Sequence, residues 1–402
     1  MRLVHVALGA MAIALAAAPA MAQKKYDPGA SDTEIKIGHS IPYSGPASAY
    51  GTIGKAIDAY FKKVNDEGGI KGRKINFISV DDGYSPPKTV EVTRQLVEQE
   101  KVLLIFNTLG TATNTAIQKY MNAKKVPQLF VATGASKWGD PAHYPWTMGW
   151  QPDYATEGAI YARYILEHKP DAKIAILYQN DDFGKDYVDG MKRGLGDKAK
   201  QMIVAEASYE VTDPTVESQM IQLKSSGADV FFNVTTPKFA AQAIRKAADL
   251  GWKPLHFLVN TSVNIKTVLA PAGLENSVGI ITAEYRKDPA DPQWADDPGV
   301  KEWKAWMAKY APDANIADQN YVYGYSAAQV MVQVLKQCGD DLTRANVMKQ
   351  AASLKDLQLP MLLPGVKINT SPTDYFPIET VRLSRFNGKA WELFGDVIES
   401  KR

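Results

Sequence analysis

The sequence predicts an α/β fold built as two Rossmann-like lobes, each a parallel β-sheet covered by helices. Short apolar runs of strand length alternate with amphipathic segments of helix length, which is typical of parallel sheets with helices on both faces. The alternation stops near residue 151 and then starts again. The chain has 402 residues, which suits two domains better than one.

The composition is that of an ordinary globular protein. Hydrophobic residues make up 45% of the chain and charged residues 22%, with a formal net charge of +2. A balance this close to neutral provides no reason to expect nucleic acid as a partner. Cys338 is the single cysteine, so no intrachain disulfide is possible and the core must be held by burial.

The first 22 residues are typical of a secretory signal peptide. Arg2 supplies the positive charge, residues 6–18 are apolar, and Ala20-Met21-Ala22 forms a small-x-small cleavage site. We expect cleavage after Ala22, export to the periplasm and a soluble mature chain. A polar leader follows at residues 23–33.

The first block alternates strands with helices. The helix predicted at 54–65 places its apolar residues on one face, and the helix at 87–100 begins with proline. A third helix follows residue 110. The predicted strands are 35–41, 75–80, 102–106 and 129–132.

The second block repeats the pattern and ends in a helical region. Its predicted helices are 154–167, 184–194, 215–225 and 237–250, and its strands are 174–178, 202–207, 230–234, 256–259 and 278–283. Helices at 298–310, 318–337 and 343–354 have no sheet of their own, so we expect them to pack on the first lobe. Strand-like segments follow at 379–386 and 390–397.

Two neighbouring strands of the first block end in small, hydroxyl-bearing loops. The strand at 102–106 leads to a polar turn, after which Thr111 or Thr113 is placed to cap a helix. The strand at 129–132 ends in residues 133–136. Ligands of open α/β sheets bind at the carboxyl ends of strands, where hydroxyls and backbone N–H groups suit a carboxylate. The alternative is that these residues only terminate strands and cap helices.

Several motifs resemble the Leu/Ile/Val-binding protein family, whose members are solute receptors of ABC importers with the type I periplasmic binding fold. They are IKIGHSIPYSGPASAYG (35–51), NDEGGIKGRKINFISVDDGYSPPKTV (65–90), GTATNTA (110–116), ATGAS (132–136), LYQNDDFGKDY (177–187) and IRKAADLGW (244–252). The resemblance implies two lobes joined by a three-strand hinge. With breaks near 151, 284 and 360, lobe 1 is expected to comprise 34–152 and 284–359, and lobe 2 153–283 and 360–402.

The resemblance also implies a set of ligand-binding residues. First-lobe loops are expected to hold the ligand carboxylate, Tyr50 to pack against the ligand, and second-lobe loops to close over it. The first-lobe residues are Tyr50, Gly110, Thr111, Thr113, Thr133, Gly134, Ala135 and Ser136. The second-lobe residues are Phe183, Thr235, Thr236, Asn260, Thr261 and Ser262. Aromatic residues expected to line the cleft beside Tyr50 are Tyr43, Tyr154, Tyr285 and Tyr323.

One departure from the family bears on the ligand. Amino-acid-binding members place a glutamate after a second-lobe strand, where it pairs with the ligand ammonium, whereas this chain has Asn260-Thr261-Ser262. Burying an unpaired ammonium is costly, so we expect a carboxylate without an α-amino group, either an aromatic or an aliphatic acid. A hydrophobic or branched-chain amino acid stays open, with Glu284 or Asp182 as substitute acids.

The sequence shows no catalytic motif, and we expect a binding protein without enzymatic activity, cofactor or metal. Its expected partners are the membrane permease and ATPase subunits of an ABC importer, with the receptor itself a monomer. A role in chemosensing fits the same ligand chemistry. An exported α/β hydrolase is a remote alternative, for which His39 is the histidine nearest to a suitable loop.

Overall fold

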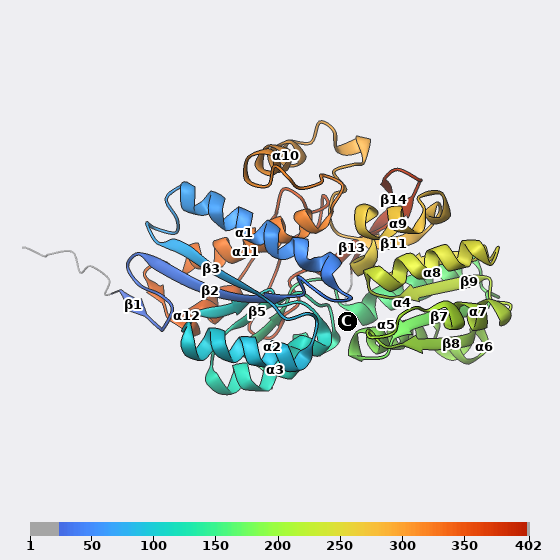
Figure 1. Ribbon diagram of the computed structural model, residues 1–402, viewed down its shortest axis with the longest axis horizontal. Helices are drawn as coiled ribbons and strands as arrows, with labels where there is room; N and C mark the ends of the chain where they lie inside the picture. Colours follow the sequence, from blue (N-terminus) through green and yellow to red (C-terminus); the bar gives the residue numbers. More distant parts are fainter. Residues whose placement is uncertain (1–23, 400–402) are drawn as a thin grey trace, which may run out of the picture.

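The computed structural model describes residues 24–399, so the predicted signal peptide lies outside the described residues. The chain forms two α/β halves side by side, the first around β2–β6 and the second around β7–β11 (Figure 1). The fold class expected from the alternation of strands and helices is confirmed.

The first half contains a five-stranded parallel sheet in the order β3-β2-β4-β5-β6. In Figure 1, α1 and α11 lie on one side of this sheet and α2 and α3 on the other. The strands are β2 (Glu34–Ile41), β3 (Lys74–Asp81), β4 (Leu104–Phe106), β5 (Gln128–Val131) and β6 (Thr147–Gly149). The helices are α1 (Gly51–Asp66), α2 (Pro86–Arg94) with its π-helical extension η2 (Gln95–Gln99), and α3 (Thr111–Lys124), and short 3-10 helices lie at η1 (Ser48–Tyr50) and η3 (Ser136–Gly139).

The second half contains a seven-stranded sheet in the order β14-β13-β11-β10-β9-β7-β8, with β13 and β14 antiparallel. Its strands are β7 (Ile174–Gln179), β8 (Ile203–Tyr209), β9 (Val230–Val234), β10 (Leu255–Leu258), β11 (Ile281–Glu284), β13 (Thr380–Phe386) and β14 (Trp391–Glu399). Its helices are α4 (Tyr154–His168), α5 (Asp182–Leu195), α6 (Ala199–Met202), α7 (Glu217–Ser225), α8 (Pro237–Asp249) and α9 (Ala270–Ala272). Short turns lie at η4 (Gly196–Lys198), η5 (Asn260–Ser262), η6 (Ile265–Leu269) and η7 (Glu275–Ser277).

Strand β9 shows why its sheet is covered on both faces. Successive side chains of a strand point to opposite faces, and here both faces are apolar. Phe232 packs edge-on against Tyr161 of α4, at 5.6 Å between ring centroids, whereas Phe231 packs against Trp252 at 5.0 Å in the cluster formed with α7 and α8. A continuous apolar strand of this kind is expected at the centre of a parallel sheet.

The late helices return to the first half, as expected from their lack of a sheet. Gly324 of α11 (Asn320–Cys338) lies so close to α1 that an added Cβ would stand 2.6 Å from the Ile53 carbonyl oxygen. Trp306 of α10 (Pro298–Tyr310) packs against Tyr60 of α1. The remaining elements are η8 (Pro292–Trp294), α12 (Arg344–Ala351) and a small parallel pair, β1 (Lys25–Tyr26) with β12 (Asp341–Leu342).

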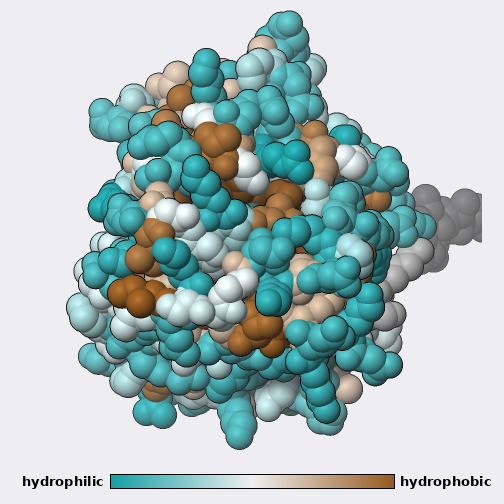
Figure 2. Space-filling view, turned by 90° about the vertical axis from the view of Figure 1, so that its right-hand side faces the viewer, coloured by the Kyte–Doolittle hydropathy of each residue, from teal (hydrophilic) through white to brown (hydrophobic). Residues whose placement is uncertain are grey.

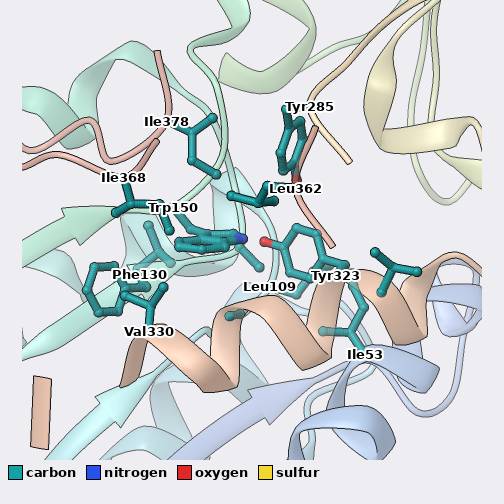
Figure 3. Close-up of a cluster of buried hydrophobic side chains, with 14 of the residues drawn as sticks. Ile53, Leu109, Phe130, Trp150, Tyr285, Tyr323, Val330, Leu362, Ile368 and Ile378 are labelled. Carbon is teal, nitrogen blue, oxygen red and sulfur yellow. The ribbon is translucent and has the colours of Figure 1, made fainter. Parts of the chain in front are cut away.

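After β11 the chain leaves the second half and runs antiparallel beside residues 361–363. The Lys287 N–H donates to the Met361 carbonyl and the Leu363 N–H to the Tyr285 carbonyl, each at 2.9 Å. We call residues 285–287 with 361–363 the hinge ribbon. Figure 3 shows Tyr285 and Leu362 next to each other in this region.

The stretch after the hinge ribbon stays on the first half for longer than expected. The Tyr375 hydroxyl donates to the Pro145 carbonyl at 3.1 Å, and the Phe376 ring lies directly against Gly139. The chain joins the second sheet only at β13. We therefore propose the last lobe boundary near residue 379 instead of 360.

The start of α3 differs from the expectation. Gly110 precedes the helix with a φ of 99°, and neither Thr111 nor Thr113 acts as a side-chain cap. Glycine adopts this conformation without strain, so it makes the sharp turn from β4 into the helix. The sequence also does not indicate the short edge strand β6.

Among residues 24–399, no helix is long and apolar enough to cross a membrane. The end of the molecule formed by the second half is largely hydrophilic, and its apolar residues lie in small separate patches (Figure 2).

The contact between Gly139 and Phe376 tests how the stretch before β13 is held. We expect Gly139→Ala to lower the free energy of unfolding by about 1–3 kcal/mol, because the new methyl group would overlap the phenylalanine ring. In a Phe376→Ala background, Gly139→Ala should lower the free energy of unfolding much less, because the phenylalanine ring that the methyl group would overlap is absent. Urea denaturation of the four variants measures this coupling, and additive costs would contradict the placement.

Candidate ligand-binding site

A cavity of about 40 Å³ lies between the two halves, at the carboxyl ends of strands from both sheets. The first half contributes Tyr50, Ile53, Tyr84, Leu109, Gly110, Thr111, Ala132, Gln151, Asn320 and Tyr323 to its wall. The second half and the hinge ribbon contribute Tyr154, Phe183, Thr236, Asn260, Thr261, Tyr285 and Arg286.

Direct contacts join the halves around this cavity. The Tyr50 hydroxyl donates to the Thr261 carbonyl at 3.1 Å. Farther out, Nδ2 of Asn264 donates to the Asp318 carboxylate at 2.6 Å. On the other side, the Ser136 N–H donates to the Asp186 carboxylate at 2.7 Å. These contacts describe a closed arrangement.

Arg286 is the charged residue in the cavity wall. Its Nε and Nη2 donate to the Glu284 carboxylate at 3.2 and 2.9 Å, and Nη2 also lies 3.3 Å from the Asn260 carbonyl. Burial alone lowers the pKa of Arg286, but the neighbouring Glu284 reverses this effect and raises it above the ordinary value. The guanidinium is therefore charged. Within residues 24–399, its Nη1 has no protein partner.

The apolar part of the wall is built from aromatic rings held by one another. Tyr154 stacks on Tyr187 with ring centroids 4.6 Å apart and meets Phe183 edge-on at 5.3 Å. Gln151 links two tyrosines across the cavity, since it accepts from the Tyr323 hydroxyl at 3.1 Å and donates to the Tyr154 hydroxyl at 2.8 Å. Figure 3 shows the Tyr323 hydroxyl pointing toward Trp150.

Asn260 lies beside Arg286 and is held from behind by Glu157 of α4. The Asn260 backbone N–H donates to Oε1 of Glu157 at 2.9 Å, and its side-chain Nδ2 donates to Oε2 at 2.6 Å. Burial raises the pKa of Glu157 to about 8, which these donors oppose. The sequence analysis did not single out Glu157, because it lies 103 residues before Asn260.

The structure brings part of the expected set to the cavity wall. Tyr285 and Tyr323 lie there with the expected residues Tyr50, Gly110, Thr111, Tyr154, Phe183, Thr236, Asn260 and Thr261. The expected residues outside the wall are Tyr43, Thr113, Thr133, Gly134, Ala135, Ser136, Thr235 and Ser262.

The residues outside the wall have structural partners instead. The Thr113 hydroxyl turns back to the carbonyls of its own helix start, and the Thr133 hydroxyl bonds that of Thr111 at 2.6 Å. Gly134 is closed off by the Pro152 carbonyl and the Tyr154 ring.

The other hydroxyls and the small residues are also engaged or buried. The Ser136 hydroxyl donates to Asp153, that of Thr235 to Asn233, and that of Ser262 to the Thr235 carbonyl. Ala135 is fully buried in the core.

Arg286, Tyr84, Gln151 and Asn320 are the polar wall residues that the sequence analysis missed. Arg286 follows the last parallel strand by two residues. The sequence signal that could have identified Arg286 is a positive charge just after a parallel strand, because the strand ends of both sheets face the cavity.

The histidine proposed for a hydrolase lies away from the cavity. His39 is fully buried, its Nδ1 lies 2.8 Å from the Ser79 hydroxyl, and burial lowers its pKa to about 3. The Tyr43 hydroxyl also bonds Ser79, which explains why Tyr43 is absent from the wall. Among the described residues, no group of three or more His, Cys, Asp or Glu side chains is placed to hold a metal ion.

Comparison with known proteins identifies the family. A model of the family described as periplasmic binding protein matches residues 34–390. Leu/Ile/Val-binding protein homolog 1 of Brucella abortus is 26% identical over 335 residues, covering 81% of this chain and 85% of the relative. Homolog 7 of Brucella suis is 25% identical over 371 residues, covering 88% of this chain and 86% of the relative.

Solved structures show the same fold. A branched chain amino acid ABC transporter protein from Thermus thermophilus with bound valine has a TM-score of 0.81 at 19% identity, covering 91% of this chain and 97% of that one. A fatty acid ABC transporter substrate-binding protein from Thermomonospora curvata has a TM-score of 0.78 at 24% identity, covering 94% and 95%. With the cavity between two α/β halves and the match over residues 34–390, the chain belongs to the periplasmic binding protein family, in its Leu/Ile/Val-binding group.

Proposed function

We propose that this protein captures a small carboxylate between its two halves and delivers it to an ABC importer. The observation that carries the proposal is Arg286. Its guanidinium is charged, faces the cavity and keeps Nη1 for a ligand oxygen. No Asp or Glu side chain lies in the described cavity wall, and the neighbouring carboxylate of Glu284 is paired with the Arg286 guanidinium.

The size of the cavity favours a compact aliphatic acid over an aromatic one. The cavity volume of about 40 Å³ is small, so the closed form favours a ligand of only a few carbon atoms. Rings and aliphatic side chains such as Tyr285, Phe183 and Ile53 supply the apolar contacts that such a ligand needs.

Capture works by a shift between open and closed forms. A ligand stabilises the closed form only by the extra affinity that it has for that form. Here the extra contacts come from the second half, whose Phe183, Thr236 and Thr261 reach the cavity only when the halves meet. Periplasmic binding proteins as a class close around their ligands by hinge motion.

The remaining parts of the proposal concern the setting of the protein. We infer export with cleavage after Ala22, action as a monomer, and delivery to permease and ATPase subunits. The Thermomonospora curvata protein is named for fatty acids, which are also carboxylates. A chemosensory role would use the same binding step.

A branched-chain amino acid is the second candidate, favoured by the valine bound in the Thermus thermophilus structure. The two acids expected as substitutes for the missing glutamate are engaged elsewhere. Glu284 pairs with Arg286 at 2.9 Å, and Asp182 pairs with Lys137 at 3.1 Å. The ligand ammonium would therefore lack a direct carboxylate partner in the described wall.

Removal of the Arg286 charge tests the carboxylate site. We expect the double variant Glu284→Gln/Arg286→Gln to weaken binding of a short acid such as isovalerate by at least about 2 kcal/mol, or roughly thirtyfold in Kd. Both partners are changed together because a single substitution would leave one buried charge unpaired. Isothermal titration calorimetry measures the effect.

The neighbouring ion pair provides a matched control. Lys287 and Asp297 lie 2.8 Å apart and both are outside the cavity wall, so Lys287→Gln/Asp297→Asn should leave the Kd nearly unchanged. Unchanged affinity in the Arg286 variant would contradict the proposed site.

The bond between Tyr50 and Thr261 tests closure. Tyr50→Phe removes a hydrogen bond between the halves, and we expect a three- to tenfold rise in Kd, from a loss of about 1 kcal/mol. Tyr43→Phe loses a hydroxyl that bonds only within the first half, to Ser79, and should bind as the unmodified protein does. Equal affinities of both variants would show that the Tyr50 bond does not contribute to closure.

A further inference from the structure

A buried carboxylate behind the cavity determines how one wall residue presents its side chain. Glu157 is fully buried and accepts four hydrogen bonds, two at each oxygen. Oε1 accepts from the Tyr161 hydroxyl at 2.6 Å and the Asn260 N–H at 2.9 Å, and Oε2 from the Tyr187 hydroxyl at 2.8 Å and Nδ2 of Asn260 at 2.6 Å.

This arrangement orients the amide of Asn260. The structure places the side-chain nitrogen of Asn260 against Oε2 of Glu157, where it donates, so the side-chain oxygen of Asn260 points away from Glu157. Asn260 is 3% exposed and lies in the cavity wall, and Oδ1 has no partner among residues 24–399. The cavity therefore contains a hydrogen-bond acceptor of fixed polarity.

This acceptor lies next to the proposed anchor for the carboxylate. Nη2 of Arg286 is 3.3 Å from the Asn260 carbonyl oxygen, so the free Nη1 of Arg286 and Oδ1 of Asn260 belong to residues in contact. The hydroxyls of the surrounding tyrosines and threonines can donate or accept, so they do not determine whether a ligand group must be a donor or an acceptor. A ligand must therefore present an anionic acceptor and a donor close together.

The donor is better matched by a hydroxyl than by an ammonium. An ammonium carries three N–H donors and a charge, and a buried charge needs a partner of opposite sign. The four hydrogen bonds to Glu157 come from the protein itself, and its carboxylate lies behind Asn260 instead of in the wall. A hydroxyl needs only one acceptor.

We propose that the ligand is a short 2-hydroxy acid, whose carboxylate binds Arg286 and whose hydroxyl donates to Oδ1 of Asn260. Glu157 is then a positioning residue that determines the polarity of the site through Asn260. This inference rests on the proposed function, because it assumes a carboxylate at Arg286.

The first experiment compares four probes of one carbon skeleton on the unmodified protein by titration calorimetry. They are 2-hydroxyisovalerate, isovalerate, 2-oxoisovalerate and valine. We expect the hydroxy acid to bind about tenfold or more tightly than isovalerate, and the oxo acid to bind worst, because its carbonyl would face the Asn260 oxygen.

Each outcome separates the two proposals. Equal binding of isovalerate and 2-hydroxyisovalerate would overturn the inference from Asn260 and leave carboxylate capture standing. If valine binds most tightly, the ligand group that donates to Oδ1 of Asn260 is an ammonium and not a hydroxyl, and the 2-hydroxy acid proposal is wrong. Binding of none of the four, nor of the hydroxy acids one carbon shorter and longer, would contradict the proposed function itself.

The second experiment changes which atom of the Asn260 amide, the oxygen or the nitrogen, faces the cavity. In Glu157→Gln the amide oxygen still accepts from the Asn260 N–H, but the new amide nitrogen faces the Asn260 side chain and should turn it over. Nδ2 would then point into the cavity, and the oxo acid should bind more tightly than the hydroxy acid. A merely structural role for Glu157 would weaken both probes alike.

Tyr187→Phe is the matched control, because it removes another donor to Oε2 of Glu157 but leaves Asn260 in place. The preference for the hydroxy acid should persist in this variant. An unchanged preference in a folded Glu157→Gln variant would contradict the positioning role. If that variant does not fold, the comparison of probes on the unmodified protein still decides the ligand class.

Discussion

The site depends on an ion pair that is almost excluded from water. The side chains of Arg286 and Glu284 are 9% and 4% exposed, and burial of two charges costs free energy that their attraction only partly returns. Apolar residues of similar size would stabilise such a position at least as well. The proposed function explains the pair, since Glu284 would hold a charged guanidinium in place and leave one of its nitrogens for the ligand carboxylate.

Closure and binding are coupled through the same set of atoms. The bonds from Tyr50 to Thr261 and from Asn264 to Asp318 join the two halves around the cavity, so the proposed opening would break them. Without a ligand, the closed form buries donors and acceptors in the cavity wall that lack partners, which costs free energy. A fitting ligand removes that cost in the closed form alone and so shifts the population toward it.

The architecture could be read from the sequence to a large extent, and the site only in part. Hydrophobic periodicity is local, so it predicts strands, helices and the loops at strand ends, including Thr111 and Asn260. It does not show which hydroxyl turns back on its own helix start, as that of Thr113 does, outside the cavity wall. Nor does it connect Glu157 with Asn260, because their contact depends on how α4 packs beside the second sheet. Arg286 was missed because a single cation in a crossing segment leaves no periodic signal.

The position of Arg286 on the hinge ribbon has a consequence for how solutes are sorted. A residue at a pivot moves least when two rigid bodies swing apart, so under the proposed hinge motion the binding point for an anion would already be present in the open form. Different acids could then make their first contact at the same guanidinium. Selection among them would then depend on the second-half residues of the cavity wall, and a solute that does not fit these residues would dissociate before closure.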